Sequence, residues 1–278
     1  MRLGAPILDA YENAEQWVGL VKAKGYRAAY SPLTGDESDA EIDRYAAAAR
    51  TADIVIAEQG AWHCNGISPD EAERKRAIDV CARKLAAANR LGARCCVSVC
   101  GSRGERWAAP HADNFREDVF AMVVDNARAI IDAVKPKNSF YTLEAMPWTY
   151  PYDVDSYERL IKAVDRDAFG VHYDPVNLVY SPERYYHSGA YINEFIRRLG
   201  GKIRACHVKD VQLVDEYVLH LEERIPGQGE LDYRTLLTGL SALDPDLPIM
   251  MEHLTRQEEY DQGDAFLRTK AAELGLSL

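Results

Sequence analysis

Long hydrophobic runs are missing from this sequence of 278 residues. No apolar segment approaches the ~20 residues that a membrane-spanning helix needs, so we expect no such helix. The segment 1–16 turns acidic before the apolar core of a signal peptide could form. Together these two absences favour a cytoplasmic protein.

Paired cysteines are missing as well. The six cysteines form no C-x-x-C motif and no regular spacing, which argues against a zinc ribbon and a disulfide framework. Four of them lie in strand-like apolar runs, where a free thiol behaves as a small hydrophobic side chain. We expect all six to be reduced and structural, as is usual in the cytoplasm.

An excess of positive charge is the third absence. The chain has 33 Lys and Arg against 44 Asp and Glu, a net charge of −11. An anionic surface repels phosphate backbones and anionic membranes, so neither nucleic acid nor a membrane is an expected partner. A small neutral or cationic ligand, or a metal ion that neutralises acidic groups locally, is expected instead.

Short apolar runs alternate with longer amphipathic segments along the whole chain. Eight strand-then-helix units predict parallel strands and a single (β/α)8 TIM barrel, with residues 1–278 as one domain. The rival is a doubly wound open sheet, which usually carries a Gly-rich phosphate loop after its first strand; this sequence has none there. The predicted strands are 2–7, 26–30, 53–59, 94–100, 139–146, 169–174, 203–209 and 248–254. The predicted helices are 12–24, 39–50, 69–90, 112–134, 153–164, 190–199, 233–243 and 256–274.

Each of the last four predicted strands ends in a polar residue: Glu144, Asp174, His207 and Glu252. A lone acid at a strand end usually caps a helix or faces solvent, and a lone histidine in an apolar strand is usually a core residue. Four such polar residues at the ends of successive strands indicate a shared site, because the strand ends of a barrel meet at its mouth. Three carboxylates brought together repel one another, and a divalent cation removes that repulsion. The donor set suits Mn²⁺, Co²⁺ or Mg²⁺ better than structural Zn²⁺.

Five motifs carry a resemblance to a known family. They are "LEAMPW" (143–148), "YDPVN" (173–177), "CHVKD" (206–210), "IPGQGELDY" (225–233) and "MEH" (251–253). In order and position they resemble the xylose-isomerase-like TIM-barrel family of sugar isomerases and epimerases, which also includes the AP endonucleases. The resemblance implies one catalytic divalent metal ion, commonly Mn²⁺ with Co²⁺, Mg²⁺ or Zn²⁺ as alternatives, held by the four strand-end residues. It also implies that Glu144 and Glu252 act as acid and base.

These residues predict an enzyme that isomerises or epimerises a ketose or keto-sugar. Proton abstraction next to the carbonyl would give a metal-stabilised enediolate, and a second carboxylate would return the proton. The alternative is a lyase or hydrolase of 3-keto-glycosides, in which the same abstraction expels a substituent. DNA repair is disfavoured by the charge and by Asn177, where the AP endonucleases carry a metal-binding histidine; sugar 3-epimerases of the family commonly carry a histidine there too, so Asn177 departs from both patterns. A sugar-binding protein without catalysis is a further alternative.

Six more residues are candidates for substrate binding. The indole of Trp62 can lie on a sugar ring, and His63 can donate to hydroxyls. Arg103 or Arg106 could instead meet a phosphate or carboxylate. Family epimerases place an arginine where Glu223 stands, with Arg224 one residue late. The six candidates are Trp62, His63, His172, Asn177, Lys209 and Arg224.

The segment 179–191 is rich in tyrosine. Such a segment predicts either a homo-oligomer whose partner covers the mouth of the barrel or a loop that folds over its own subunit. The glycines at 227 and 229 favour a loop with unusual backbone angles more than a phosphate cradle.

Overall fold

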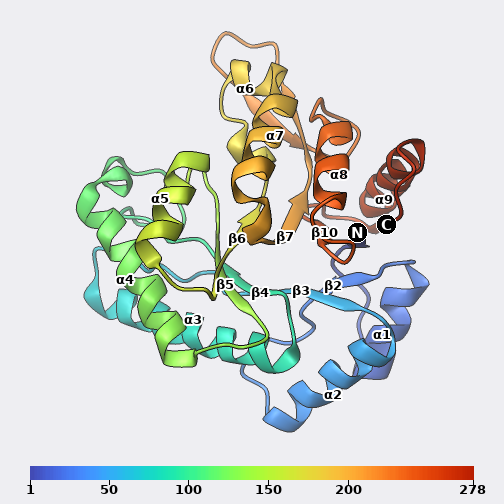
Figure 1. Ribbon diagram of the computed structural model, residues 1–278, viewed down its shortest axis with the longest axis horizontal. Coiled ribbons are helices and arrows are strands. Elements are labelled where there is room, and N and C mark those ends of the chain that lie inside the picture. Colours follow the sequence, from blue (N-terminus) through green and yellow to red (C-terminus); the bar gives the residue numbers. More distant parts are fainter.

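The computed structural model describes residues 1–278, and its centre is a nearly closed barrel of eight strands surrounded by helices (Figure 1). All paired barrel strands are parallel, in the order β1-β10-β7-β6-β5-β4-β3-β2. Each predicted apolar run contains one barrel strand, which confirms the (β/α)8 fold and excludes the doubly wound sheet. The barrel strands are β1 (Arg2–Gly4), β2 (Ala28–Tyr30), β3 (Val55–Gly60), β4 (Cys95–Ser98), β5 (Phe140–Glu144), β6 (Phe169–Tyr173), β7 (Ile203–Val208) and β10 (Pro248–Met251).

The barrel closes between β1 and β2, which are the two ends of the hydrogen-bonded sheet. The Arg27 N–H donates to the Leu3 carbonyl at 3.1 Å across this seam. A Cβ on Gly4 would lie 2.3 Å from the Ala28 carbonyl oxygen. Glycine at position 4 therefore allows the two strands to approach closely enough to close the barrel.

Helices begin where polar side chains satisfy free backbone N–H groups. Asn13, Ser38 and Asp153 each accept from the N–H three residues on. Asp70 caps the third helix, so Pro69 precedes that helix and does not occupy its first turn as predicted. No helix combines the length and the apolar character that crossing a bilayer requires. The helices are α1 (Ala14–Ala23), α2 (Asp39–Thr51), α3 (Glu71–Leu91), α4 (Glu117–Val134), α5 (Val154–Val164), α6 (Pro182–Tyr186), α7 (Ser188–Leu199), α8 (Tyr233–Ser241) and α9 (Gln257–Glu273).

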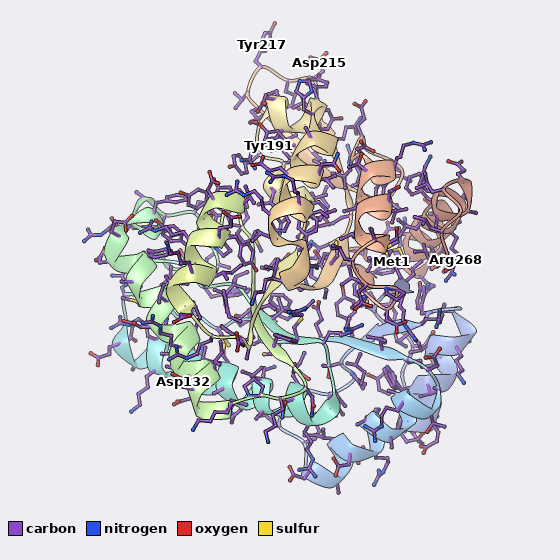
Figure 2. The ribbon with its side chains drawn as sticks, in the orientation of Figure 1. Met1, Asp132, Tyr191, Asp215, Tyr217 and Arg268 are labelled. Carbon is purple, nitrogen blue, oxygen red and sulfur yellow. The ribbon has the colours of Figure 1, made fainter.

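A β-hairpin between β7 and α8 is absent from the sequence-based prediction. Its strands β8 (Asp210–Leu213) and β9 (Leu221–Arg224) pair antiparallel outside the barrel sheet. The turn projects from the body of the molecule, and Figure 2 shows Tyr217 at its outermost end. The side chains of Tyr217, Val218 and Leu219 are exposed there.

The tyrosine-rich segment 179–191 forms α6 and the start of α7. The guanidinium carbon of Arg184 lies 4.1 Å from the ring centre of Tyr180 and 4.7 Å from that of Tyr191. The segment is therefore ordered by contacts within the same chain. None of its residues lines the cavity at the barrel mouth.

Candidate metal centre

The ends of β5, β6, β7 and β10 bring Glu144, Asp174, His207 and Glu252 together. One ligand atom of each lies within 4.8 Å of the others. The side chains of Asp174 and His207 are fully buried, that of Glu144 is 4% exposed and that of Glu252 is 11% exposed. The four groups thus share one buried site, and Glu252 is its most accessible member.

Strand register explains why these side chains meet. Glu144 lies in register with His172 on the neighbouring strand, and His207 lies in register with Met250. Residues in register on parallel strands point to the same side of a sheet, and here that side is the interior of the barrel. Glu252 follows Met250 by two residues, so it belongs to the same face.

Glu58 on β3 reaches the same interior through a β-bulge. Ala29 pairs with Ile56 but Tyr30 pairs with Glu58, so Ala57 is an extra residue on β3. The bulge turns Ala57 and Glu58 both into the barrel, whereas strict alternation would place them on opposite faces. Sequence reasoning missed Glu58; its only signal was an acid inside the apolar run 53–59.

Glu58 connects two buried histidines. Its Oε2 lies 2.7 Å from Nε2 of His172, and its Oε1 lies 3.3 Å from Nε2 of His207. The other ring nitrogen of His207, Nδ1, lies 3.0 Å from Glu252 and 3.3 Å from Glu144. His207 therefore presents Nδ1 to the acidic cluster while Glu58 accepts from Nε2–H. A carboxylate behind a metal-binding histidine fixes its tautomer and ring orientation in this way.

Lys209 supplies a cation to the cluster. Its Nζ lies 2.8 Å from Asp174 Oδ2 and 2.7 Å from Glu252 Oε1, and its side chain is 2% exposed. Burial alone would lower the pKa of Lys209, but the surrounding carboxylates outweigh burial and raise the pKa well above its ordinary value. Lys209 is thus a buried charged group.

The carboxylates respond differently to their surroundings. Burial raises the pKa of Asp174 to about 7, with repulsion from Glu144 and Glu252 adding to it and Lys209 opposing it. Burial also acts on Glu252, but His207 and Lys209 outweigh it and hold the pKa of that carboxyl well below its ordinary value. For Glu58 the two histidines outweigh burial and lower the pKa to about 2. The cluster therefore concentrates negative charge beside its two cationic partners.

Two buried oxygens indicate that this cluster suits a divalent ion. Asp174 Oδ2 and Glu252 Oε1 meet no hydrogen-bond donor in good geometry and share one ammonium, that of Lys209, at 2.8 and 2.7 Å. Buried carboxylate oxygens are costly unless they are paired or bind a metal. Three carboxylates that share a single ammonium, beside an imidazole Nδ1, are a donor set that Mn²⁺, Co²⁺ or Mg²⁺ accepts. The four residues fit the expected ion.

A cavity of about 940 Å³ opens above the cluster. Glu144 and Glu252 line it, and so do Trp62, His63, Asn177 and Lys209 among the predicted substrate-binding residues. All four tryptophans of the chain line it as well: Trp17, Trp62, Trp107 and Trp148. The barrel mouth is thus an aromatic-walled chamber with the acidic cluster at its floor.

Two predicted substrate-binding residues do not reach this cavity. His172 is completely buried behind His207 and contacts Glu58. Arg224 lies on β9, where it donates to Gln212 and pairs with Glu222. Neither lines the chamber.

The predicted anion contacts are also absent from the cavity. Arg103 donates to the backbone carbonyls of Ile67 and Ser68, and Arg106 does not line the chamber. The amide of Gly227 donates to Asp210, and a Cβ on Gly229 would lie 2.3 Å from the Val211 carbonyl. The glycine loop is therefore tied to Asp210 and packed against β8, as expected of a structural loop.

Asn177 links the two sides of the cluster. Its Nδ2 donates to Glu144 Oε1 at 3.0 Å, and its Oδ1 accepts from Lys209 at 3.3 Å. An amide can serve as donor and acceptor at once, which neither a carboxylate nor an ammonium can do. Asparagine at this position thus orients Glu144 and Lys209 relative to each other.

Comparison with known proteins places this buried carboxylate–histidine barrel in a family. The family model described as xylose isomerase-like TIM barrel matches residues 18–270. The chain belongs to that family, which confirms the resemblance carried by the strand-end motifs. A sequence comparison with curated proteins finds no match.

Several solved structures are similar over nearly the whole chain. D-psicose 3-epimerase in the presence of D-fructose is 15% identical with a TM-score of 0.70, covering 98% of this chain and 98% of that one. The 3-keto-D-glucoside 4-epimerase from E. coli is 16% identical with a TM-score of 0.70, covering 97% and 99%. A xylose isomerase-like protein from Mycobacterium smegmatis in complex with magnesium is 17% identical with a TM-score of 0.68, covering 98% and 97%. At these identities the similarity shows the fold.

Proposed function

We propose that this protein is a divalent-metal-dependent isomerase or epimerase of a ketose or keto-sugar. The observation that carries the proposal is the convergence of three carboxylates and one imidazole beneath a large cavity. Two of those carboxylates, Asp174 and Glu252, share the single ammonium of Lys209. Structural relatives that act on ketoses and on a keto-glucoside support the same reaction class.

Glu144, Asp174, His207 and Glu252 would hold the ion, with Mn²⁺ expected and Co²⁺, Mg²⁺ or Zn²⁺ as alternatives. When bound, the ion supplies electrophilic polarisation of a substrate carbonyl, which makes the neighbouring C–H bond more acidic. Glu58 keeps the His207 ring in the orientation that turns Nδ1 toward the cluster.

Glu144 and Glu252 are suited to move the proton. They line the cavity from β5 and β10, and β6 and β7 lie between those strands in the sheet. Glu252 contacts an ammonium, whereas Glu144 accepts from the neutral amide of Asn177. One carboxylate can remove a proton and the other can return it, which inverts a carbon centre. The ammonium of Lys209 can donate to an oxygen on which negative charge develops.

The partner of the site is a small neutral sugar. No arginine lines the cavity, and its two lysines, Lys84 and Lys209, are already bonded to groups of the chain. A sugar phosphate would therefore find no guanidinium to bind its phosphate there. The expectation of a homo-oligomer also remains a proposal, and the exposed apolar turn of the β8–β9 hairpin supports it.

A lyase or hydrolase of 3-keto-glycosides is the second candidate, and the size of the cavity favours it. One glutamate would again remove the proton, the electron pair of that C–H bond would form a C=C bond as the C–O bond on the neighbouring carbon breaks, and the departing oxygen would take up a proton from the other glutamate. Incubation in D₂O distinguishes the two reactions: epimerisation gives a sugar that has exchanged one proton for deuterium, while elimination releases the substituent.

The test uses the purified enzyme with a panel of ketoses and 3-keto-sugars. Chelation should abolish turnover and proton exchange, and Mn²⁺ or Co²⁺ should restore both. Glu222→Gln is a matched control, because Glu222 lies on β9 and does not line the cavity. Full activity after exhaustive metal removal would refute the proposal.

A further inference from the structure

The two halves of the cavity differ in character. All four proposed metal ligands come from β5, β6, β7 and β10 or the residues directly after them. The other half is formed after β1 to β4 and consists mainly of apolar and aromatic side chains. Those members are Ala5, Pro6, Ile7, Tyr11, Trp17, Tyr30, Pro32, Leu33, Trp62, Val99, Trp107 and Ala108.

The apolar half is held in place by its own hydrogen bonds. The hydroxyl of Tyr11, after β1, donates to the Pro32 carbonyl after β2 at 3.3 Å. The Gln59 amide donates to the Leu33 and Thr34 carbonyls at 3.1 and 3.2 Å. Ile7 and Leu33 keep part of their surface open to solvent. The wall is thus a preformed apolar surface, which is the usual form of a small-molecule site.

Trp62 is placed on this wall by a neighbouring glycine. A Cβ on Gly60 would lie 2.2 Å from Nε1 of Trp62, so the indole occupies the space that any larger residue would fill. The imidazole of His63 lies 5.0 Å from the Trp107 ring, centre to centre. Lys84, a cation on this side, donates to the Gly60 carbonyl at 3.1 Å.

The volume exceeds what a single sugar needs. At about 940 Å³ the cavity lies near the top of the range of ~300–1,000 Å³ for pockets that enclose drug-sized ligands. A hexose is a fraction of that size and would be drawn to the polar floor by its hydroxyls. The open apolar side chains of the wall, such as Ile7 and Leu33, would then remain in contact with water, which is less favourable than contact with an apolar group.

We propose that this wall is a subsite for an uncharged aromatic or aliphatic substituent, so that the substrate is a keto-glycoside with an apolar aglycone and not a free ketose. This rests on the proposed function for the sugar end of the substrate. The sugar ring lies over the acidic cluster, and the aglycone packs on Ile7, Leu33 and the indoles beside them.

Intrinsic fluorescence measures this binding directly. Because all four tryptophans line the cavity, a change in emission reports on that cavity. The probes are phenyl and methyl 1-thio-β-D-glucopyranoside, which share the sugar and differ only in the aglycone, titrated into the metal-loaded protein. We expect the phenyl compound to bind about tenfold more tightly or better, because the phenyl ring buries apolar surface that methyl cannot.

Ile7→Asp should remove that advantage and leave the affinity for the methyl compound within about twofold. Leu8→Asp is the matched control: Leu8 is the next residue, is 50% exposed and does not line the cavity. Leu33→Asp is the second variant, in case Ile7→Asp unfolds. Equal affinities for the two probes in the wild type, or an advantage that survives both cavity variants, would overturn the subsite.

The proposed subsite and the proposed reaction can be refuted independently of each other. Tighter phenyl binding that Ile7→Asp removes, without turnover of any keto-sugar, keeps the subsite and refutes the proposed reaction. Turnover of free ketoses with no preference for the phenyl probe keeps the reaction and refutes the subsite.

Discussion

The two ends of the barrel differ in how their carboxylates are exposed and paired. At the amino ends of the strands, Arg2 lies 2.8 Å from Asp53 and 2.7 Å from Asp246, and Arg94 lies 2.9 Å from Asp244. The aspartates there are between 36% and 68% exposed. At the carboxyl ends, four carboxylates are buried or nearly so beside one lysine and two histidines.

This difference separates stability from function. Exposed ion pairs cost little to form and contribute about 0–1 kcal/mol each. Buried carboxylates in excess of cations destabilise a fold, and a chain retains them where they bind something. The ion pairs at the amino end therefore add a little stability, whereas the carboxyl end is a site whose excess negative charge a ligand would balance. The predictions below test that division.

The largest effect is expected for Glu252→Gln. Loss of one proton-transferring carboxylate should lower kcat by about 10²–10⁴-fold at saturating Mn²⁺ and substrate. Deuterium exchange into substrate measures this loss, and circular dichroism confirms that the variant is folded. A variant that retains more than half of the wild-type kcat would contradict the role of Glu252, whereas Glu222→Gln should be fully active.

Lys209→Met should destabilise the metal-free protein by about 3–5 kcal/mol, because Asp174 and Glu252 lose the buried cation between them. Added Mn²⁺ should restore part of that loss, since the ion supplies the missing positive charge. Urea unfolding with and without Mn²⁺ measures both changes. If the ion stabilised wild type and variant equally, the ammonium and the ion would not share the same carboxylates.

Glu58→Gln should weaken metal binding by about 10–100-fold without removing a ligand, because the His207 ring loses its charged partner. Competition with a fluorescent chelator gives the dissociation constant. The ¹⁵N chemical shifts of the His207 ring provide a readout that a merely structural role would leave unchanged. Unaltered shifts and affinity would show that Glu58 does not position this histidine.

Arg2→Met tests the other end of the barrel. The Arg2 side chain is 8% exposed and bridges two exposed aspartates, so its loss should lower the melting temperature by about 2–4 °C. The kcat should be unchanged, because Arg2 lies at the opposite end of the strands from the cavity. If the variant lost kcat but kept its melting temperature, the amino end would contribute to function, against the comparison drawn above.

The smallest effect concerns pH. The Arg2 guanidinium holds the pKa of Asp246 below its ordinary value of 3.8. A lowered folded-state pKa contributes stability above the ordinary value, and that contribution disappears as pH falls through the lowered one. The difference in melting temperature between wild type and Arg2→Met should thus be constant near pH 7 and shrink below about pH 4. If the difference in melting temperature became larger as the pH falls, the pairing of Arg2 with Asp246 would be contradicted.

Most of the fold was predictable because local pattern and tertiary structure agree. Each apolar run became one barrel strand, and two-residue alternation placed Glu144, His207 and Glu252 on the interior face. The hairpin of β8 and β9 was missed because its turn carries acids and exposed apolar residues together, a mixture typical of a loop. The helix predicted over 112–134 is interrupted at Arg116, whose extended ψ of 150° separates a short 3₁₀ turn from α4.

The site was only partly predictable, for a different physical reason. The inward orientation of Glu58 depends on a β-bulge, and a single extra residue in a strand cannot be recognised from the hydrophobic pattern. His172 shares the interior face as expected, but His207 and Glu58 surround it, so it does not reach the cavity. The apolar wall combines loops after four different strands, and their proximity follows from the closed barrel and not from any one segment.

Lys209 also bears on whether a metal ion would be needed for folding. Small zinc domains stay unfolded until metal arrives, because nothing else neutralises their ligands. Here an ammonium carried by the polypeptide already lies between Asp174 and Glu252. The barrel can therefore fold before any metal ion binds, and an ion would be selected from those available to the folded protein.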